Sequence, residues 1–248
     1  MEFVDFTEEG PVTRFKTKYQ YERTNIIRGK NKLLPILNLI KDKAVICGGM
    51  ARWMVSQDKD TPLPSDIDIY PFSNLIFNEL EPQFNQKMFK VFESKGSVSY
   101  SQTAFNNPDN YSVQLIKPDV VKCDPNAESS FEKACSILDK FDYTVCKTAI
   151  GQFDGKLGAI KDRWFDKDER EKRLRIHHIN CPIATLIRSR KYTLKGYRLS
   201  AFEIIKCLEH WRTITPEETR AKVAAWFDKE ATEKMTFEEL YEVITFID

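Results

Sequence analysis

AVICGGMAR at residues 44–52, followed by SDIDIY at residues 65–70, is the part of the sequence that decides the fold. The first stretch is a short apolar run that ends in Gly48-Gly49 and continues from Met50 as a helix-like pattern. The second stretch alternates Asp with Ile, which predicts a strand with one apolar and one acidic face. A strand, a glycine pair, a helix, a loop and an acidic strand are therefore expected in this order.

Asp66 and Asp68 stand two residues apart on the predicted strand, so both carboxylates project from one face. Ile67 and Ile69 then point into the core. Two carboxylates this close repel each other unless a cation binds between them, and hard oxygen ligands suit Mg²⁺ or Mn²⁺ rather than zinc. A pair of such ions stabilises the attacking and leaving oxygens of a phosphoryl displacement. The alternative is a solvated strand edge that holds no metal.

The glycine pair supplies what the two carboxylates lack. Gly48 and Gly49 allow a ligand to approach the backbone closely, and the helix that begins at Met50 offers free N–H groups to a triphosphate. Arg52 follows one turn further along this helix. A glycine pair after a strand is also a common turn, so the phosphate-binding hypothesis depends on the acidic strand that follows.

The rest of the chain predicts a mixed α/β part and then an all-helical part. Runs at 98–105 and 111–117 predict one hairpin, and Asp154-Gly155 predicts a second hairpin within residues 142–160. Helices are expected at 31–41, 76–93, 129–140, 180–192, 200–212, 216–228 and 236–247. We therefore expect an α+β fold, with a mixed sheet and flanking helices in a domain at 1–165 and a helical domain at 166–248.

Composition and cysteine use indicate a soluble intracellular protein. The 248 residues are 42% hydrophobic and 30% charged, and the net charge of +1 neither requires nor excludes a nucleic-acid partner. The six cysteines form no CxxC pair, which argues against a zinc site and a disulfide framework. The MEFVD start lacks the pattern of a signal peptide, and no apolar run approaches ~18 residues. We expect a cytoplasmic protein with no membrane partner.

Gly48-Gly49-Met50-Ala51-Arg52 followed by Asp66-Ile67-Asp68-Ile69 resembles the head-domain signature of the polymerase-β superfamily. It is most similar to the class II CCA-adding tRNA nucleotidyltransferases and the bacterial poly(A) polymerases. The intervening residues 50–65 are a few more than that superfamily usually has. The resemblance implies a Mg²⁺-dependent (or Mn²⁺-dependent) nucleotidyltransferase that moves NMP from an NTP such as ATP to an acceptor hydroxyl and releases pyrophosphate. It also implies that Asp66 and Asp68 hold the metal, while Gly48, Gly49 and Arg52 bind the triphosphate.

FDYTVCKTA at residues 141–149 resembles a second motif, which contains Arg-Asp-Phe-Thr and follows the sheet in those enzymes. The resemblance implies that Asp142 faces the nucleotide, where it contacts the sugar or acts as a third catalytic carboxylate. Thr144, two residues further along a predicted strand, would share its face. The alternative is that Asp142 caps the strand or lies on the surface. Gln114 stands where some superfamily members place their third acid, but an amide is no strong metal ligand, so Asp142 is favoured.

Residues 180–197 resemble the neck helix of the same enzymes. In that family the helix carries Glu-Asp-x-x-Arg, which pairs with the incoming base, whereas the matching positions here hold Asn180, Cys181 and Ala184. The missing template argues against CCA addition itself. The basic helix from Arg188 through Arg190 to Lys195 is expected to bind the nucleotide or acceptor phosphates, or else is a solvated face.

The resemblance implies a tRNA or other RNA 3′ end as the acceptor, although the short helical part also permits a protein or a small molecule. Compact relatives of this kind look like those carried by bacteriophages, which suggests a phage origin and action in the host cytoplasm. The rival hypothesis is a non-catalytic nucleotide- or RNA-binding module that keeps the fold. His177, His178 and His210 have no charge partner spaced to make a catalytic base, so we expect structural roles for them.

Overall fold

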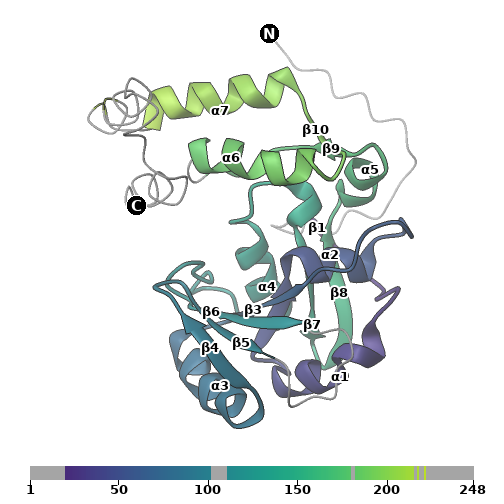
Figure 1. The fold of residues 1–248 in the computed structure, drawn as a ribbon, viewed down its shortest axis with the longest axis vertical. Helices are drawn as coiled ribbons and strands as arrows, with labels where there is room; N and C mark the ends of the chain where they lie inside the picture. The colour runs from purple at the N-terminus through teal and green to yellow at the C-terminus, as the bar shows by residue number, and fades with distance from the viewer. Residues whose placement is uncertain (1–19, 102–110, 180–181, 215–216, 218–220, 222–248) are drawn as a thin grey trace.

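The computed structural model describes residues 20–101, 111–179, 182–214, 217 and 221. A sheet-based part, here called the head (residues 20–162), lies below a helical part, here called the neck (residues 165–214) (Figure 1). The α+β fold expected from the sequence is confirmed, with a mixed sheet, flanking helices and helices after the sheet. Within these residues no helix is long and apolar enough to cross a membrane.

Among the described residues, eight strands form one sheet in the order β1-β8-β7-β2-β3-β6-β5-β4. The strands are β1 (Tyr21–Thr24), β2 (Ala44–Cys47), β3 (Asp66–Pro71), β4 (Phe89–Glu93), β5 (Ser97–Ser101), β6 (Ser112–Ile116), β7 (Thr148–Phe153) and β8 (Lys156–Asp162). Strand β3 pairs antiparallel with β2 and parallel with β6. The acidic strand is therefore central, not at an edge of the sheet.

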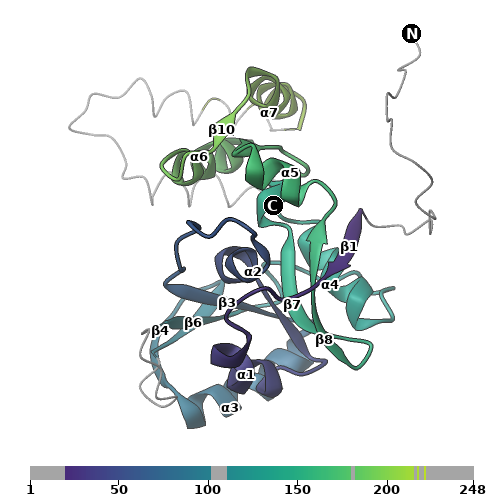
Figure 2. The same cartoon turned by 90° about the vertical axis from the view of Figure 1, so that its right-hand side faces the viewer.

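The two faces of the sheet carry separate hydrophobic cores. Helices α1 (Lys30–Leu39), α2 (Gly48–Val55) and α3 (Asn74–Lys87) pack on one face with Ile67 and Ile69, which are fully buried (Figure 2). Helix α4 (Ser130–Leu138) packs on the other face over Val45 and Ala149. Since side chains alternate along β3, Asp66 and Asp68 lie on the face that α4 covers only in part.

The neck begins with α5 (Phe165–Arg170) and ends with α7 (Ala201–Ile214). Between them lie α6 (Pro182–Thr193) and the short parallel strands β9 (Arg173–Leu174) and β10 (Arg198–Leu199). Figure 1 shows α6 above the sheet, with α7 further from it. Helix α6 is thus the neck helix that lies nearest the open part of the head.

Both expected hairpin pairings are confirmed, since β5 pairs antiparallel with β6 and β7 with β8. Asp154 and Gly155 adopt φ of 52° and 79°, the left-handed values of a tight hairpin turn. The helix predicted over 76–93 is wrong beyond Lys87, because residues 89–93 pair with β5 as an edge strand. The residues between β5 and β6 and the helices expected at 216–228 and 236–247 lie outside the described ranges, apart from isolated positions.

Candidate active site

The glycine turn lies directly beside the acidic strand. Cys47, the last residue of β2, is the register partner of Asp68 on β3. Gly48 then turns the chain with φ of +73°, and a Cβ placed on it would lie 3.1 Å from Asp68 Oδ2. A side chain at this position would therefore be strained by the backbone and crowd the carboxylate. Helix α2 begins at this turn, which brings its first backbone N–H groups to the same end of the sheet.

Asp66 and Asp68 share the open face of β3, as the alternation predicts, and both are half-buried. Burial and, to a smaller extent, the charge of Asp66 raise the pKa of Asp68 to about 7. A hard divalent cation would relieve this repulsion, and two carboxylates suit Mg²⁺, which commonly takes its remaining ligands from phosphates and water. In the described part of the chain, no group of three or more His, Cys, Asp or Glu side chains is placed to hold a metal ion.

Gln114 lies next to the acidic pair on the neighbouring strand. It is the register partner of Asp68 across the parallel β3–β6 pairing, and Ser112 is the partner of Asp66. Both side chains are half-buried. The position beside Asp68 therefore carries a neutral amide, which can accept or donate a hydrogen bond but adds no charge to the site.

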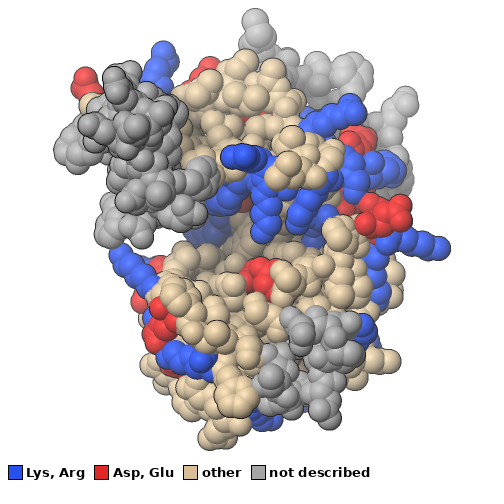
Figure 3. Space-filling model, viewed as in Figure 1, with Lys and Arg blue, Asp and Glu red and all other residues tan. Residues whose placement is uncertain are grey.

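Helix α6 brings positive charge to the opposite side of the site. Figure 3 shows a hollow between neck and head, with acidic side chains below it and a row of Lys and Arg side chains above it. The charge of Lys191 acts on Asp68 and lowers its pKa against the effects of burial and Asp66. Burial lowers the pKa of Lys195, and the charge of Asp66 opposes this shift. Lys191 therefore interacts electrostatically with Asp68, and Lys195 with Asp66.

The basic stretch from Arg188 to Lys195 was expected to bind as a whole, with Arg188 and Arg190 singled out, whereas the structure brings Lys191 and Lys195 closest in electrostatic effect to the two acids. The signal was the basic run itself, because positions 188, 191 and 195 recur at spacings of three and four, the spacing of one helix face. Arg190 falls between them and is exposed. Its contact with a nucleotide stays a prediction.

Asp142 is buried at the junction of head and neck and forms an ion pair with Arg188. Burial raises the pKa of Asp142, although the charge of Arg188 opposes this shift. The backbone oxygen of Asp142 accepts a 2.8 Å hydrogen bond from the backbone N–H of His177. Among the described residues Asp142 forms no metal-holding group with Asp66 and Asp68, and its role as a third carboxylate or as a sugar contact stays a prediction. Its side chain instead anchors an α6 arginine whose side chain remains 42% exposed.

The strand expected from residue 142 onward is wrong up to residue 147. Thr144–Cys146 form a 3-10 helix, and β7 begins only at Thr148. Thr144 is fully buried, and its hydroxyl donates a hydrogen bond to Asp168 of α5. Arg175 binds the same carboxylate at 2.9 and 3.1 Å. Thr144 therefore does not share a strand face with Asp142, because its side chain points to the neck, and its contact with a nucleotide stays a prediction.

Arg52 is also engaged with the neck. Its side chain is 7% exposed, its Nε lies 3.4 Å from Glu169 Oε2, and its guanidinium lies 5.1 Å from the ring centroid of Tyr197. Ala184, one of the three positions that replace the base-selecting residues, is fully buried. Asn180 and Cys181, the other two, lie outside the described residues.

Comparisons with known proteins identify the fold. No family model and no curated protein matches this sequence. Among solved structures, the chain is similar to the Thermotoga maritima CCA-adding enzyme complexed with tRNA, with a TM-score of 0.51 and 15% identity over 82% of this chain and 50% of that one. A CCA-adding enzyme in complex with ATP gives a TM-score of 0.50 and 19% identity over 76% of this chain and 46% of that one.

The chain spans about half the length of these solved structures. At such low identity the likeness is one of fold. It shows that this chain shares the fold of these CCA-adding enzymes, the fold that the two sequence motifs predict.

Proposed function

We propose that this chain is a Mg²⁺-dependent nucleotidyltransferase that moves NMP from an NTP to an acceptor hydroxyl and releases pyrophosphate. The observation that carries the proposal is the place of Gly48, whose missing side chain leaves room directly beside Asp68. The charge of Lys191 on α6 acts on Asp68, and Figure 3 shows Lys and Arg side chains across a hollow from acidic ones. Such a site offers a carboxylate pair for a metal and donors and positive charge for a triphosphate.

Each side of the proposed site has a distinct task. Asp66 and Asp68 would hold Mg²⁺, which when bound neutralises charge on the phosphates and on the departing pyrophosphate. The turn at Gly48-Gly49 and the first N–H groups of α2 bind the triphosphate from the head side. Lys191 and Lys195 bind it from the neck side.

The acceptor is oriented so that its hydroxyl oxygen forms a bond to the α-phosphorus. The bond from this phosphorus to the oxygen shared with the β-phosphate breaks, that oxygen leaves with pyrophosphate, and the proton of the attacking hydroxyl passes to water. Positioning and charge neutralisation supply most of the catalysis in this class of reaction. The ion pair with Asp142 positions Arg188 of α6, whose guanidinium would contact the base or the acceptor.

An RNA 3′ end is the acceptor that we favour. The exposed side chains of Arg190 and Lys191 extend the positive charge of α6 towards solvent, where the phosphates of a nucleic acid would approach. The tRNA and ATP complexes of the similar structures are consistent with this choice. Base preference is open, since Ala184 is buried and the amino-acid template is missing.

The test is incubation of the protein with Mg²⁺, each labelled NTP in turn and a total RNA pool. We expect label in RNA and release of pyrophosphate, both abolished by Asp66→Asn and by Asp68→Asn. Asp60→Asn is the matched control, because Asp60 is an exposed carboxylate in the loop that precedes β3. Transfer that survives the double variant Asp66→Asn/Asp68→Asn would refute the site assignment.

The same assay separates the rival hypothesis. Tight binding of an NTP with no transfer to RNA, protein or small molecules would favour a non-catalytic binding module. One observation motivates this rival. Gln114, beside Asp68, is neutral where some members of the superfamily that the sequence resembles have an acid. If the missing acid is what prevents transfer, Gln114→Glu should restore it, whereas a module that lacks turnover for other reasons would stay inactive.

A further inference from the structure

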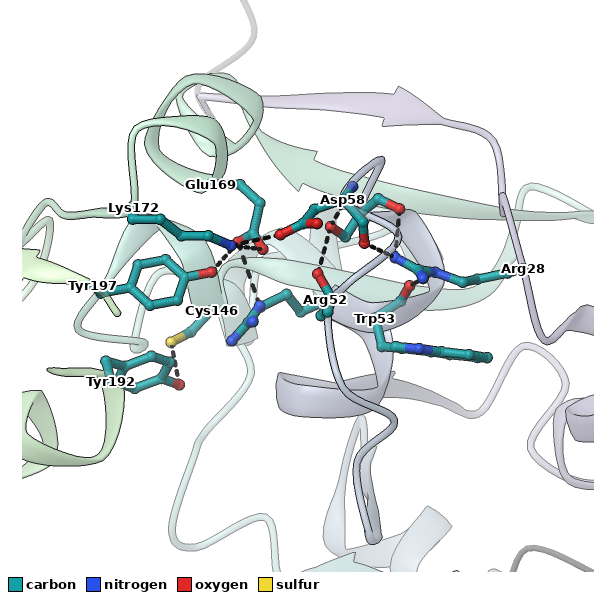
Figure 4. Close-up of polar contacts among 11 residues, drawn as sticks. Arg28, Arg52, Trp53, Asp58, Cys146, Glu169, Lys172, Tyr192 and Tyr197 are labelled. Carbon is teal, nitrogen blue, oxygen red and sulfur yellow. Dashed lines mark hydrogen bonds and ion pairs between the residues drawn. The ribbon is translucent and has the colours of Figure 1, made fainter. Parts of the chain in front are cut away.

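A buried carboxylate on the first neck helix joins the head to the neck. Glu169 of α5 accepts a 2.6 Å hydrogen bond from the Tyr197 hydroxyl and lies 3.4 Å from Arg52 Nε of α2 (Figure 4). Lys172 Nζ lies 3.7 Å from its other oxygen. Both cations also make cation–π contacts with one ring, since Arg52 and Lys172 each lie 5.1 Å from the ring centroid of Tyr197. Three groups from two parts of the chain thus converge on one carboxylate.

Lys172 extends this cluster to the loop before β3. Its Nζ donates a 2.7 Å hydrogen bond to Asp58 Oδ2, which lowers the pKa of that carboxyl. The loop around Asp58 is itself held, because the guanidinium of Arg28 donates to the backbone oxygens of Asp58, Ser56 and Trp53 at 2.7, 2.9 and 2.7 Å. Lys172 therefore ties the neck to a loop that is firmly attached to the head. We call Arg52, Asp58, Glu169, Lys172 and Tyr197 the head–neck latch.

The latch is connected to both sides of the candidate site by short lengths of chain. Arg52 lies one helical turn after Gly48 in α2, so it shares the helix that begins at the glycine turn. Tyr197 follows Lys195 by two residues, and Lys195 lies in the turn that follows the end of α6 at Thr193. A change in the distance between Arg52 and Tyr197 would therefore change the distance between the glycine turn and the two lysines, Lys191 and Lys195.

The chemistry of the latch favours a positioning role over a purely stabilising one. Buried ion pairs lose hydration on folding, so well-packed apolar side chains of similar size often stabilise a protein equally well. Ion pairs and hydrogen bonds, by contrast, require particular distances and directions. Arg52 and Glu169 are 7% and 5% exposed, so solvent screens their interaction little.

We propose that the head–neck latch sets the width of the nucleotide site. It holds Lys191 and Lys195 at one distance from Asp66 and Asp68, so that a triphosphate is bound by both sides at once. Glu169, Lys172, Tyr197 and Asp58 are positioning residues in this proposal, since they act through α6 and the glycine turn. The proposal rests on the proposed function for its effect on turnover, but the geometry that it describes can be measured without turnover.

The test uses Tyr197→Phe, Asp58→Asn and Lys172→Met in the full chain. Tyr197→Phe removes one hydroxyl and keeps the ring, and Asp58→Asn removes one charge at constant size. Glu79→Gln is the matched control, because Glu79 forms an ion pair with Lys43 within the head. The head–neck distance is measured by pulsed electron paramagnetic resonance, with spin labels on cysteines introduced at the exposed Asn85 and Glu209. Cys123→Ser and Cys181→Ser leave only native cysteines that are buried.

We expect each latch variant to broaden the distance distribution and to raise KM for the NTP about tenfold, with a smaller change in kcat. Lys172→Met combined with Asp58→Asn should act less than additively, since both remove the same contact. The control should match the wild type in every measurement. An unchanged distance distribution, or a change in distance with unchanged KM and NTP affinity, would overturn the proposal. Losses of NTP affinity that only parallel the unfolded fraction measured in thermal melts would also overturn it.

Failure of the proposed function gives a different pattern. If the wild type transfers no nucleotide, the distance distributions and the equilibrium affinity for Mg²⁺–NTP still decide whether the latch sets the width of the site. If the wild type is active and the latch variants keep its KM and its distances, the latch proposal fails while the proposed function stands.

Discussion

Replacing Gly48 with alanine should damage the metal site more than it damages the fold. Gly48 has φ of +73°, and an added Cβ would lie 3.1 Å from Asp68 Oδ2. The left-handed backbone costs an alanine about 1–2 kcal/mol in the free energy of unfolding. The contact adds a second effect, because the Asp68 carboxylate must move by a few tenths of an ångström. A displacement of a metal-holding oxygen on this scale is expected to lower Mg²⁺-dependent turnover about tenfold to a hundredfold.

Two other glycines separate these effects. Gly155 has φ of +79° and nothing within 4 Å of an added Cβ, so Gly155→Ala introduces the strain without the crowding. Gly49 would meet only Pro64 at 3.5 Å, an ordinary contact, so Gly49→Ala should leave stability nearly unchanged. If a triphosphate approaches this backbone, Gly49→Ala still lowers NTP affinity.

The assay pairs urea denaturation with labelled-NTP transfer, and the rate is expressed per folded molecule at saturating and at limiting Mg²⁺. We expect Gly48→Ala and Gly155→Ala to lose similar stability, while only Gly48→Ala requires more Mg²⁺ and turns over slowly. Equal turnover per folded molecule in these two variants would refute the argument that Gly48 keeps Asp68 in place.

Two predictions concern buried charges. The pKa of Asp68, raised to about 7 in the folded state, lies above its value of about 3.9 in the unfolded chain, so the folded state binds more protons between these pH values. The free energy of unfolding of the metal-free protein should therefore fall as pH rises towards 7, and Asp68→Asn should abolish this fall in urea denaturation curves recorded with a chelator. The pH dependence that comes from Lys147 has the opposite sign, because burial lowers its pKa to about 8. The unfolded state therefore binds more protons above this pH, and the free energy of unfolding rises towards pH 10. Lys147→Met should remove a rise of about 3 kcal/mol, and parallel pH curves for the variant and the wild type would contradict this reasoning.

Local pattern was sufficient to predict the central part of the head. The alternation in residues 66–69 predicted a strand with two acids on one face, and the structure buries Ile67 and Ile69 fully. Asp154-Gly155 predicted the β7–β8 turn, because left-handed backbone at two successive positions favours these residue types. In each case the deciding interaction lies between residues that are close in the chain.

The errors occurred where distant contacts decide the local structure. Residues 89–93 continue the helical pattern of α3 but pair with β5 as an edge strand. Residues 142–147 have the composition of a strand, yet Asp142 forms an ion pair with Arg188 and Thr144 a hydrogen bond with Asp168. Thr144–Cys146 form a 3-10 helix instead. Propensity is a weak prior, and tertiary packing overrides it in short segments of this kind.

The contrast is sharpest at the candidate site. That a glycine turn and an acidic strand follow one another could be predicted from the sequence alone, because conformational freedom and side-chain alternation are properties of near neighbours. The opposition of Lys191 and Lys195 to Asp66 and Asp68, and the pairing of Arg52 with Glu169 of the neck, depend instead on how the chain packs. Electrostatic partners are set by distance in space, and the packing of α5 and α6 on the head brings together residues that lie more than a hundred positions apart in the chain.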